Sequence, residues 1–149
     1  MDKRLYKNAD EFDAKNWHWP HFSCQELKCK CGKFCDGEYY HHPKFLDALE
    51  KLRARIGVVE INSARRCLNH NAKVGGVKNS MHTSAIAVDI KIGNHPRKEL
   101  YEAAVFAGFT GMGFGVNFLH LDLGPRRRWT YPGGIGLWKR ALGYDPLRI

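Results

Sequence analysis

The sequence has no apolar run that approaches the roughly 18 residues of a membrane-spanning helix. No apolar stretch follows residues 1–6, so we expect no signal peptide and synthesis in a cytoplasm. Internal repeats, linkers and low-complexity segments are also missing. At 149 residues the chain is long enough for a real core, and we expect one domain over residues 1–149, with residues 1–22 packing on it as an extension.

Acidic residues are scarce: 15 Asp and Glu stand against 24 Lys and Arg, which gives a net charge of +9. Such a surface favours polyanionic partners, whether nucleic acid, anionic lipid or anionic cell-wall polymer. The basic residues are scattered along the chain, except in two clusters at 51–55 and 126–128. We interpret the charge as general attraction rather than as a docking stripe.

The sequence has an odd number of cysteines, which argues against a disulfide framework in a chain without a signal peptide. They are Cys24, Cys29, Cys31, Cys35 and Cys67. Three of them form the pattern Cys29-x-Cys31-x3-Cys35, which is not a standard zinc-finger spacing. Free buried thiols are therefore the favoured interpretation. A second, structural zinc that uses some of these thiols with Cys67 is the alternative.

A strand with a metal-binding side chain is predicted at residues 85–90. Small or acidic residues alternate here with branched apolar residues, so Asp89 points to the face opposite the apolar side chains. His82 lies in the loop that leads into this strand, seven residues before Asp89. The alanines beside Asp89 leave room on its face, which suits a cleft.

The alternation recurs in residues 118–123, where leucines occupy one face and His120 and Asp122 the other. If the two strands are neighbours, His82, Asp89 and His120 converge on one ion. Two imidazoles and one carboxylate leave a fourth position open for water, which is the pattern of a catalytic zinc site. The metal would lower the pKa of that water and polarise a substrate carbonyl. The alternative is that these side chains are ordinary hydrogen-bonded groups of the core or the surface.

Helical and strand signals surround these two stretches. Two amphipathic helices are expected, each with an early proline and a closing glycine, over 43–56 and 94–108. Three shorter elements are expected: a helical turn after Ser23, a strand over 58–61, and a glycine-rich turn or strand over 111–115. The tail, 132–149, shows no clear period.

Motifs over about residues 20–131 match a known pattern. Its central part is met at Ser63, Arg66, His70, Asn71, Gly75, Gly76, Ser80, His82, Ala87 and Asp89. Its closing part is met at Phe118, His120, Asp122, Gly124, Arg128 and Trp129. Together with His21-Phe22-Ser23 and Cys29-x-Cys31-Gly32, these motifs make the chain resemble the zinc D-Ala-D-Ala peptidases, in their short branch from phages and bacteria. That family shares its fold with the hedgehog signalling domain.

The resemblance implies an α+β fold of the hedgehog and D-Ala-D-Ala peptidase type, with a small antiparallel sheet flanked by helices. It implies hydrolysis of a peptide bond in peptidoglycan stem or crosslink peptides, with one catalytic zinc held by His82, Asp89 and His120. Asp122 would take a proton from the zinc-bound water or orient a group that does. Arg66 would bind the scissile carbonyl or a substrate carboxylate.

The resemblance also implies partners and a setting. Ser80 would contact the substrate, and anionic cell-wall or outer-membrane polymers would attract the basic surface. We expect a monomer, with no nucleic-acid partner and no stable membrane insertion. A phage endolysin, released by a holin from the cytoplasm to the wall, is the natural setting, and a virion-borne lysin or a bacterial enzyme remains open. Three bonds also remain open: a terminal D-Ala bond, a D-Ala crosslink, and the bond between L-Ala and D-Glu.

Two positions depart from the family pattern. Ala85 replaces the glycine that follows the zinc histidine by three residues, which adds one methyl group near the site. Asn117 stands where some relatives carry an acidic residue three positions before the final histidine, which leaves Asp122 as the best candidate for the base.

Three other functions fit part of this sequence. An Fe(II) oxygenase also uses two histidines and a carboxylate, but it needs a later histidine, and none follows His120. A nucleic-acid module built on the cysteines would need another spacing. A zinc-containing wall-binding module without turnover is the main alternative, and the presence of Asp122 and Arg66 argues against it.

Overall fold

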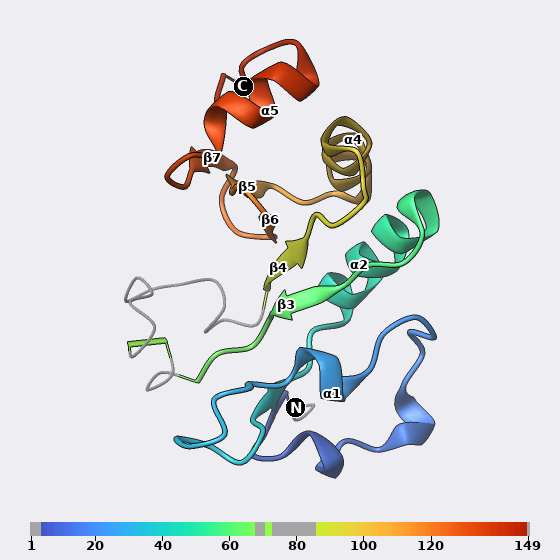
Figure 1. Cartoon of the computed structure of the whole chain (residues 1–149). Helices are drawn as coiled ribbons and strands as arrows, with labels where there is room; N and C mark the ends of the chain where they lie inside the picture. Colours follow the sequence, from blue (N-terminus) through green and yellow to red (C-terminus); the bar gives the residue numbers. More distant parts are fainter. Residues whose placement is uncertain (1–3, 68–70, 73–85, 149) are drawn as a thin grey trace.

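The computed structural model describes residues 4–67, 71–72 and 86–148, and its centre is a five-stranded sheet (Figure 1). The strand order is β3-β4-β6-β5-β7. All neighbours in this sheet are antiparallel except β5 and β7, which run parallel. The strands are β3 (Ile61–Ser63), β4 (Ala87–Lys91), β5 (Gly111–Phe114), β6 (Phe118–Asp122) and β7 (Arg127–Thr130).

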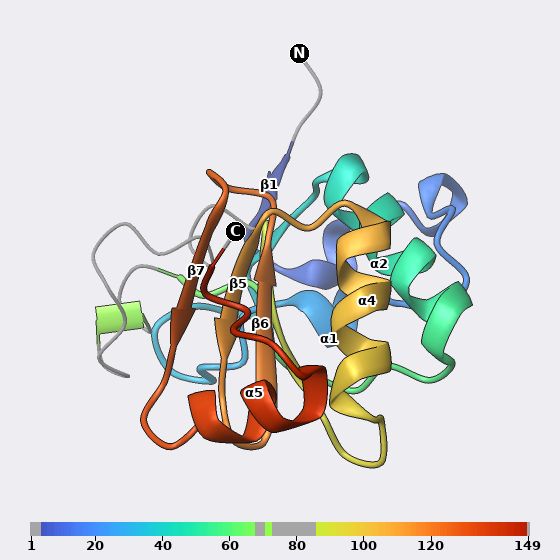
Figure 2. The ribbon, with the colours of Figure 1, turned by 90° about the horizontal axis from the view of Figure 1, so that it is seen from above.

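Helices cover one face of this sheet. Helices α2 and α4 pack on each other along that face, and α5 lies beyond the ends of β5 and β6 (Figure 2). None of the helices in the described ranges is both long and apolar enough to cross a bilayer. The helices are α1 (Cys24–Leu27), α2 (Pro43–Ile56), α4 (Arg97–Ala107) and α5 (Ile135–Leu142).

The amino-terminal part lies beside β3 and α2 (Figure 1). It contains two short 3-10 helices, η1 (Ala9–Glu11) and η2 (Ala14–Asn16), and a small sheet of β1 (Leu5–Tyr6) with β2 (Tyr39–Tyr40). The indole of Trp19 donates a hydrogen bond to Asp47 of α2 at 2.9 Å. Aromatic side chains thus attach this part to the helical layer.

The core lies between the sheet and the helices. Each long strand turns alternate apolar side chains toward α2 and α4, because side chains in a strand alternate between its two faces. Six of these sheet residues are fully buried: Val88, Ile90, Met112, Phe114, Leu119 and Leu121. The period-two pattern of 85–90 and 118–123 therefore predicted the buried face correctly.

The expected α+β class is confirmed, and α2 has the predicted bounds. The ring of His42 accepts a hydrogen bond from the Phe45 N–H at the start of α2, and Gly57 ends it with a φ of 84°. Helix α4 begins three residues later than predicted, because Pro96 is its N-cap. The strand predicted at 58–61 begins only at Ile61. Val58, at the predicted start, lies before the strand and is 72% exposed.

Two elements of the carboxyl-terminal part were not predicted. Strand β7 makes the sheet mixed rather than purely antiparallel. Helix α5 lies in the tail for which no period was seen. Its Trp138 is fully buried and donates a hydrogen bond to the Gly115 carbonyl at 2.8 Å. The helix is short and has glycines at both ends, which hid its apolar spacing.

Candidate functional site

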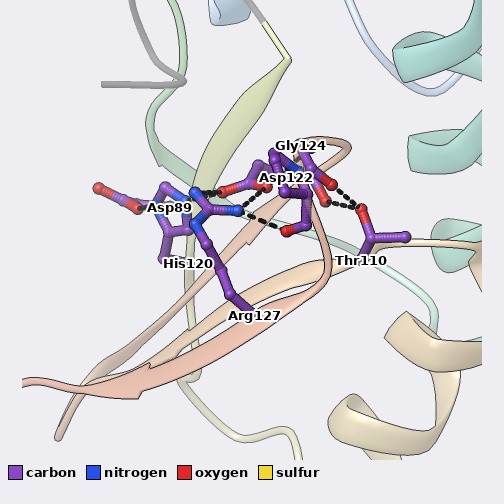
Figure 3. Close-up of polar contacts among 7 residues, drawn as sticks. Asp89, Thr110, His120, Asp122, Gly124 and Arg127 are labelled. Carbon is purple, nitrogen blue, oxygen red and sulfur yellow. Dashed lines mark hydrogen bonds and ion pairs between the residues drawn. The ribbon is translucent and has the colours of Figure 1, made fainter. Parts of the chain in front are cut away.

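The pairing of β4 with β6 creates the candidate site. Asp89 lies directly opposite His120, and Ala87 lies opposite Asp122, so all four side chains share the face that points away from the helices. The His120 Nδ1 and Asp89 Oδ1 atoms are 2.9 Å apart (Figure 3). The two strands are neighbours, as the prediction of a shared ion requires.

Asp122 is fully buried behind His120 and accepts hydrogen bonds at both carboxylate oxygens. Its Oδ2 atom is 2.7 Å from His120 Nε2 and 2.8 Å from Arg127 Nη2. Its Oδ1 atom accepts from Arg127 Nη1 and from the Gly124 N–H, each at 2.9 Å (Figure 3). Burial alone would raise the pKa of Asp122, but the hydrogen bonds from His120 and Arg127 outweigh it and lower that pKa. The group is therefore held as a carboxylate.

His120 is held at both ring nitrogens. Burial would lower its pKa, but hydrogen bonds to Asp122 and Asp89 have the larger combined effect and raise it. The imidazole ring of His120 is also fixed from the side by the Trp129 ring, since the two ring centroids are 5.0 Å apart. The orientation of His120 is thus set by two carboxylates and one aromatic ring.

Two glycines of β5 make this arrangement possible. Strand β5 lies between β6 and β7, and its Gly111 and Gly113 occupy the site face. A Cβ atom at Gly111 would lie 2.1 Å from an Asp122 oxygen, and one at Gly113 would lie 2.6 Å from the Trp129 ring. Because these positions carry no side chain, Arg127 and Trp129 of β7 reach across β5 to the residues of β6.

A pocket of about 270 Å³ opens beside Asp89. Arg66 lines it and is half-buried. Burial lowers the pKa of Arg66, while the negative charge of Asp89 acts in the opposite direction. Arg65 differs, since its Nε atom donates to Glu38 at 3.1 Å. The pocket thus brings Arg66 close to Asp89, whereas Arg65 pairs with Glu38.

Asp89 and His120 fit the requirements of a metal site. Ligand atoms around a tetrahedral zinc ion are about 3.3 Å apart, close to the separation of Asp89 Oδ1 and His120 Nδ1. A metal-binding histidine commonly donates its other N–H to a carboxylate, and Asp122 occupies that position. The predicted residues His82 and Ser80 lie outside the described residues, as does Ala85.

Arg127 was missed by the sequence interpretation. It was assigned to a basic cluster acting by general attraction, but it makes a two-pronged ion pair with buried Asp122. Arg128, which matches the family pattern, instead donates to the Tyr101 hydroxyl at 2.7 Å. One signal was available: Gly111 and Gly113 share the two-residue spacing of His120 and Asp122, which predicts a face with room for side chains of a further strand.

The cysteines were expected to be free buried thiols, and four of them form a group. The sulfur atoms of Cys29, Cys31, Cys35 and Cys67 all lie within 4.8 Å of one another. Burial would raise the pKa of the Cys31 thiol, but backbone N–H groups that point at its sulfur lower it to about 6. Burial raises the pKa of Cys29 to about 12. This grouping favours the alternative interpretation, in which the thiols bind a metal.

Comparison with known proteins agrees with the motifs. The family model described as peptidase M15 matches residues 20–122. The peptidoglycan L,D-endopeptidase MepK of Escherichia coli K12 is 30% identical over 97 residues, which cover 58% of this chain and 53% of MepK. The MepK proteins of E. coli O157:H7 and Shigella flexneri match to the same extent. The chain spans about half the length of these curated relatives. With the match to more than half of its own length, the chain belongs to the peptidase M15 family, the zinc D-Ala-D-Ala peptidases that its motifs resemble.

Proposed function

We propose that this chain is a zinc-dependent peptidase that hydrolyses peptide bonds in peptidoglycan stem or crosslink peptides. The observation that carries the proposal is the convergence of Asp89 and His120, with Asp122 behind the histidine, in a member of the M15 family. The name of the MepK relatives supports peptidoglycan as the substrate. The net charge of +9 supports attraction to anionic wall or outer-membrane polymers.

The zinc ligands in this proposal are His82, Asp89 and His120. When bound, zinc lowers the pKa of a coordinated water and polarises the scissile carbonyl. Asp89 and His120 supply their donor atoms from adjacent strands of a sheet, which holds them rigidly. His82 would add its imidazole from the segment before β4.

Asp122 acts in this proposal by orienting the zinc ligand His120. This role differs from the two predicted ones, which were to take the proton from zinc-bound water or to orient the group that does. Both of its oxygens accept hydrogen bonds, and its side chain is fully buried. A carboxylate in this position fixes the tautomer and the ring direction of a metal-binding histidine. Proton transfer from water would require Asp122 to exchange those bonds for a contact with solvent.

The pocket beside Asp89 would bind the substrate peptide. Lys28, Lys30 and Arg66 line it, so a peptide carboxylate would meet three positive charges there. Arg66 would bind either that carboxylate or the scissile carbonyl, whose developing negative charge a fixed guanidinium stabilises. Ser80 would contact the substrate from the segment before β4.

The cleaved bond and the biological setting are finer parts of the proposal. Endopeptidase action is favoured by the name of the MepK relatives, L,D-endopeptidase, and its two candidate bonds are the D-Ala crosslink and the bond between L-Ala and D-Glu. Carboxypeptidase action on a terminal D-Ala is the alternative. As the setting we propose a phage endolysin that acts on the wall, because His21-Phe22-Ser23 and Cys29-x-Cys31-Gly32 resemble the short branch from phages and bacteria.

Digestion of purified peptidoglycan, with products identified by mass spectrometry, tests the proposal. We expect new amino and carboxyl ends with zinc present, and none after chelation or with Asp89→Asn. Asp145→Asn, which changes an aspartate near the carboxyl terminus that pairs with Lys139, serves as the matched control and should cleave normally. The new ends identify the bond. A zinc-loaded protein that binds several wall chemotypes without releasing products would refute the enzyme and favour a wall-binding module.

A further inference from the structure

A second cluster of metal-binding side chains lies outside the site of Asp89 and His120. The loop that follows α1 contributes Cys29, Cys31 and Cys35, and the segment after β3 contributes Cys67. We propose that these four cysteines bind one structural zinc ion, which fixes the basic wall of the pocket beside Asp89. The inference does not depend on the proposed catalytic zinc.

The spacing of the sulfur atoms fits one tetrahedral ion. Zinc–sulfur bonds of about 2.3 Å place the four sulfurs of a tetrahedral site about 3.8 Å apart. All four sulfurs here lie within 4.8 Å of one another, and those of Cys31 and Cys35 are 3.5 Å apart. None of the five cysteines, all of which the structure describes, forms a disulfide. Four thiolates in tetrahedral arrangement select zinc or iron among the common metals.

The backbone around the sulfurs is arranged to stabilise thiolates. The Phe34 N–H donates to Cys31 Sγ, and the Cys67 N–H donates to Cys29 Sγ, each at 3.3 Å. Gly32, which follows Cys31, has a φ of 64°, a backbone conformation that other residues rarely adopt. This turn points successive N–H groups at the Cys31 sulfur, as in other anion-binding turns.

The surrounding charges suit a tetrathiolate site, which carries a net charge of −2 around zinc. Lys28, Lys30 and Lys33 alternate with the cysteines along the loop. The guanidinium of Arg66 also lies close enough to Cys29 for their charges to interact. Positive residues therefore flank the cluster in the sequence, and one of them, Arg66, interacts with Cys29.

The cluster joins the two walls of the pocket. Lys28 and Lys30 flank Cys29 in the sequence, and Arg66 precedes Cys67, so three pocket-lining residues are each adjacent to a cluster cysteine. Between the two segments, the Arg65 N–H donates to the Leu27 carbonyl at 3.1 Å. A metal at the cluster would fix their spacing more strongly than this hydrogen bond alone.

Zinc content measured on the purified, reduced protein tests the inference. We expect two zinc ions per chain for the wild type, one for Cys67→Ser and one for His120→Ala. Cys24→Ser, which changes the cysteine outside the cluster, is the matched control and should retain two. If the catalytic site binds no zinc, the count falls to one and depends on Cys67 but not on His120, so the two proposals fail separately.

A measurement on the unaltered protein covers the case in which cluster variants do not fold. Cobalt(II) in place of zinc should give thiolate-to-cobalt charge-transfer absorption in the near ultraviolet, and Cys24→Ser should leave it unchanged. Absence of this band would overturn the inference, as would equal zinc contents of Cys67→Ser and Cys24→Ser. Iron in place of zinc, or a protein mass that shows disulfides within the cluster, would overturn it too.

Discussion

The two faces of the five-stranded sheet differ in character although the same strands form both. On the helix side, the alternate residues of β4, β5 and β6 are apolar and fully buried. On the other side, the same strands carry Asp89, His120 and Asp122, together with two glycines. Burial of apolar area stabilises the fold, whereas burial of charge costs free energy unless each charge is paired. The apolar face that packs on the helices therefore holds the strands in register, and this register places the charged groups of the opposite face.

The first prediction concerns a substitution at the centre of the charged face. His120→Ala should reduce peptide hydrolysis by about 10³-fold, equivalent to about 4 kcal/mol of transition-state stabilisation, because the proposed zinc site would lose one of its ligands. Initial rates on a crosslinked peptide measure this effect. His18→Ala changes an exposed histidine and should leave the rate within about twofold of wild type. A near-normal rate for His120→Ala would show that His120 is not part of the active site.

The second prediction concerns a substitution in the apolar face, one residue further along β6. Leu121→Ala should lower the free energy of unfolding by about 2–5 kcal/mol, since Leu121 is fully buried and its loss leaves a cavity. Denaturant unfolding followed by circular dichroism measures it. Val58→Ala, at a position 72% exposed, should change stability by less than about 0.5 kcal/mol. Similar losses for the two variants would contradict the assignment of the core.

The third prediction tests how the charged face accommodates its bulky partners. Gly113→Ala would bring a methyl group to 2.6 Å from the Trp129 ring, so either the ring or β5 must move. We expect a loss of about 1–3 kcal/mol in stability and weaker activity. Gly136→Ala, in α5, meets its first neighbouring atom only at 3.9 Å and should be neutral or slightly stabilising.

The fourth prediction sharpens the comparison within the charged face itself. Asp122→Asn should weaken zinc binding by about 10–100-fold, because the carboxylate that holds His120 loses its charge. Excess zinc should restore most of the activity, and competition with a chelator measures the affinity. If instead zinc affinity is unchanged and the rate stays low at saturating zinc, Asp122 is the base that accepts the proton. Asp145→Asn should alter neither quantity.

The sequence predicted those parts of the molecule that depend on local alternation. Asp89 and His120 stand out against apolar neighbours, and the capping signals at Pro43 and Gly57 define α2. The contribution of Arg127 could not be read in this way, because it depends on β7 pairing in parallel with a strand that is not its chain neighbour. The cysteine cluster was equally hidden, since Cys67 reaches it across 32 positions of chain.

The contribution of β7 also decides how long a fragment must be to keep the site intact. The family match ends at Asp122, five residues before the arginine that pairs with it. A fragment cut at that boundary would keep Asp89 and His120, but it would leave a buried carboxylate without its guanidinium and β5 with an unpaired edge. A chimera that borrows the site of Asp89 and His120 would therefore have to carry the chain through Thr130. The transferable unit is larger than the part that is recognisable by similarity.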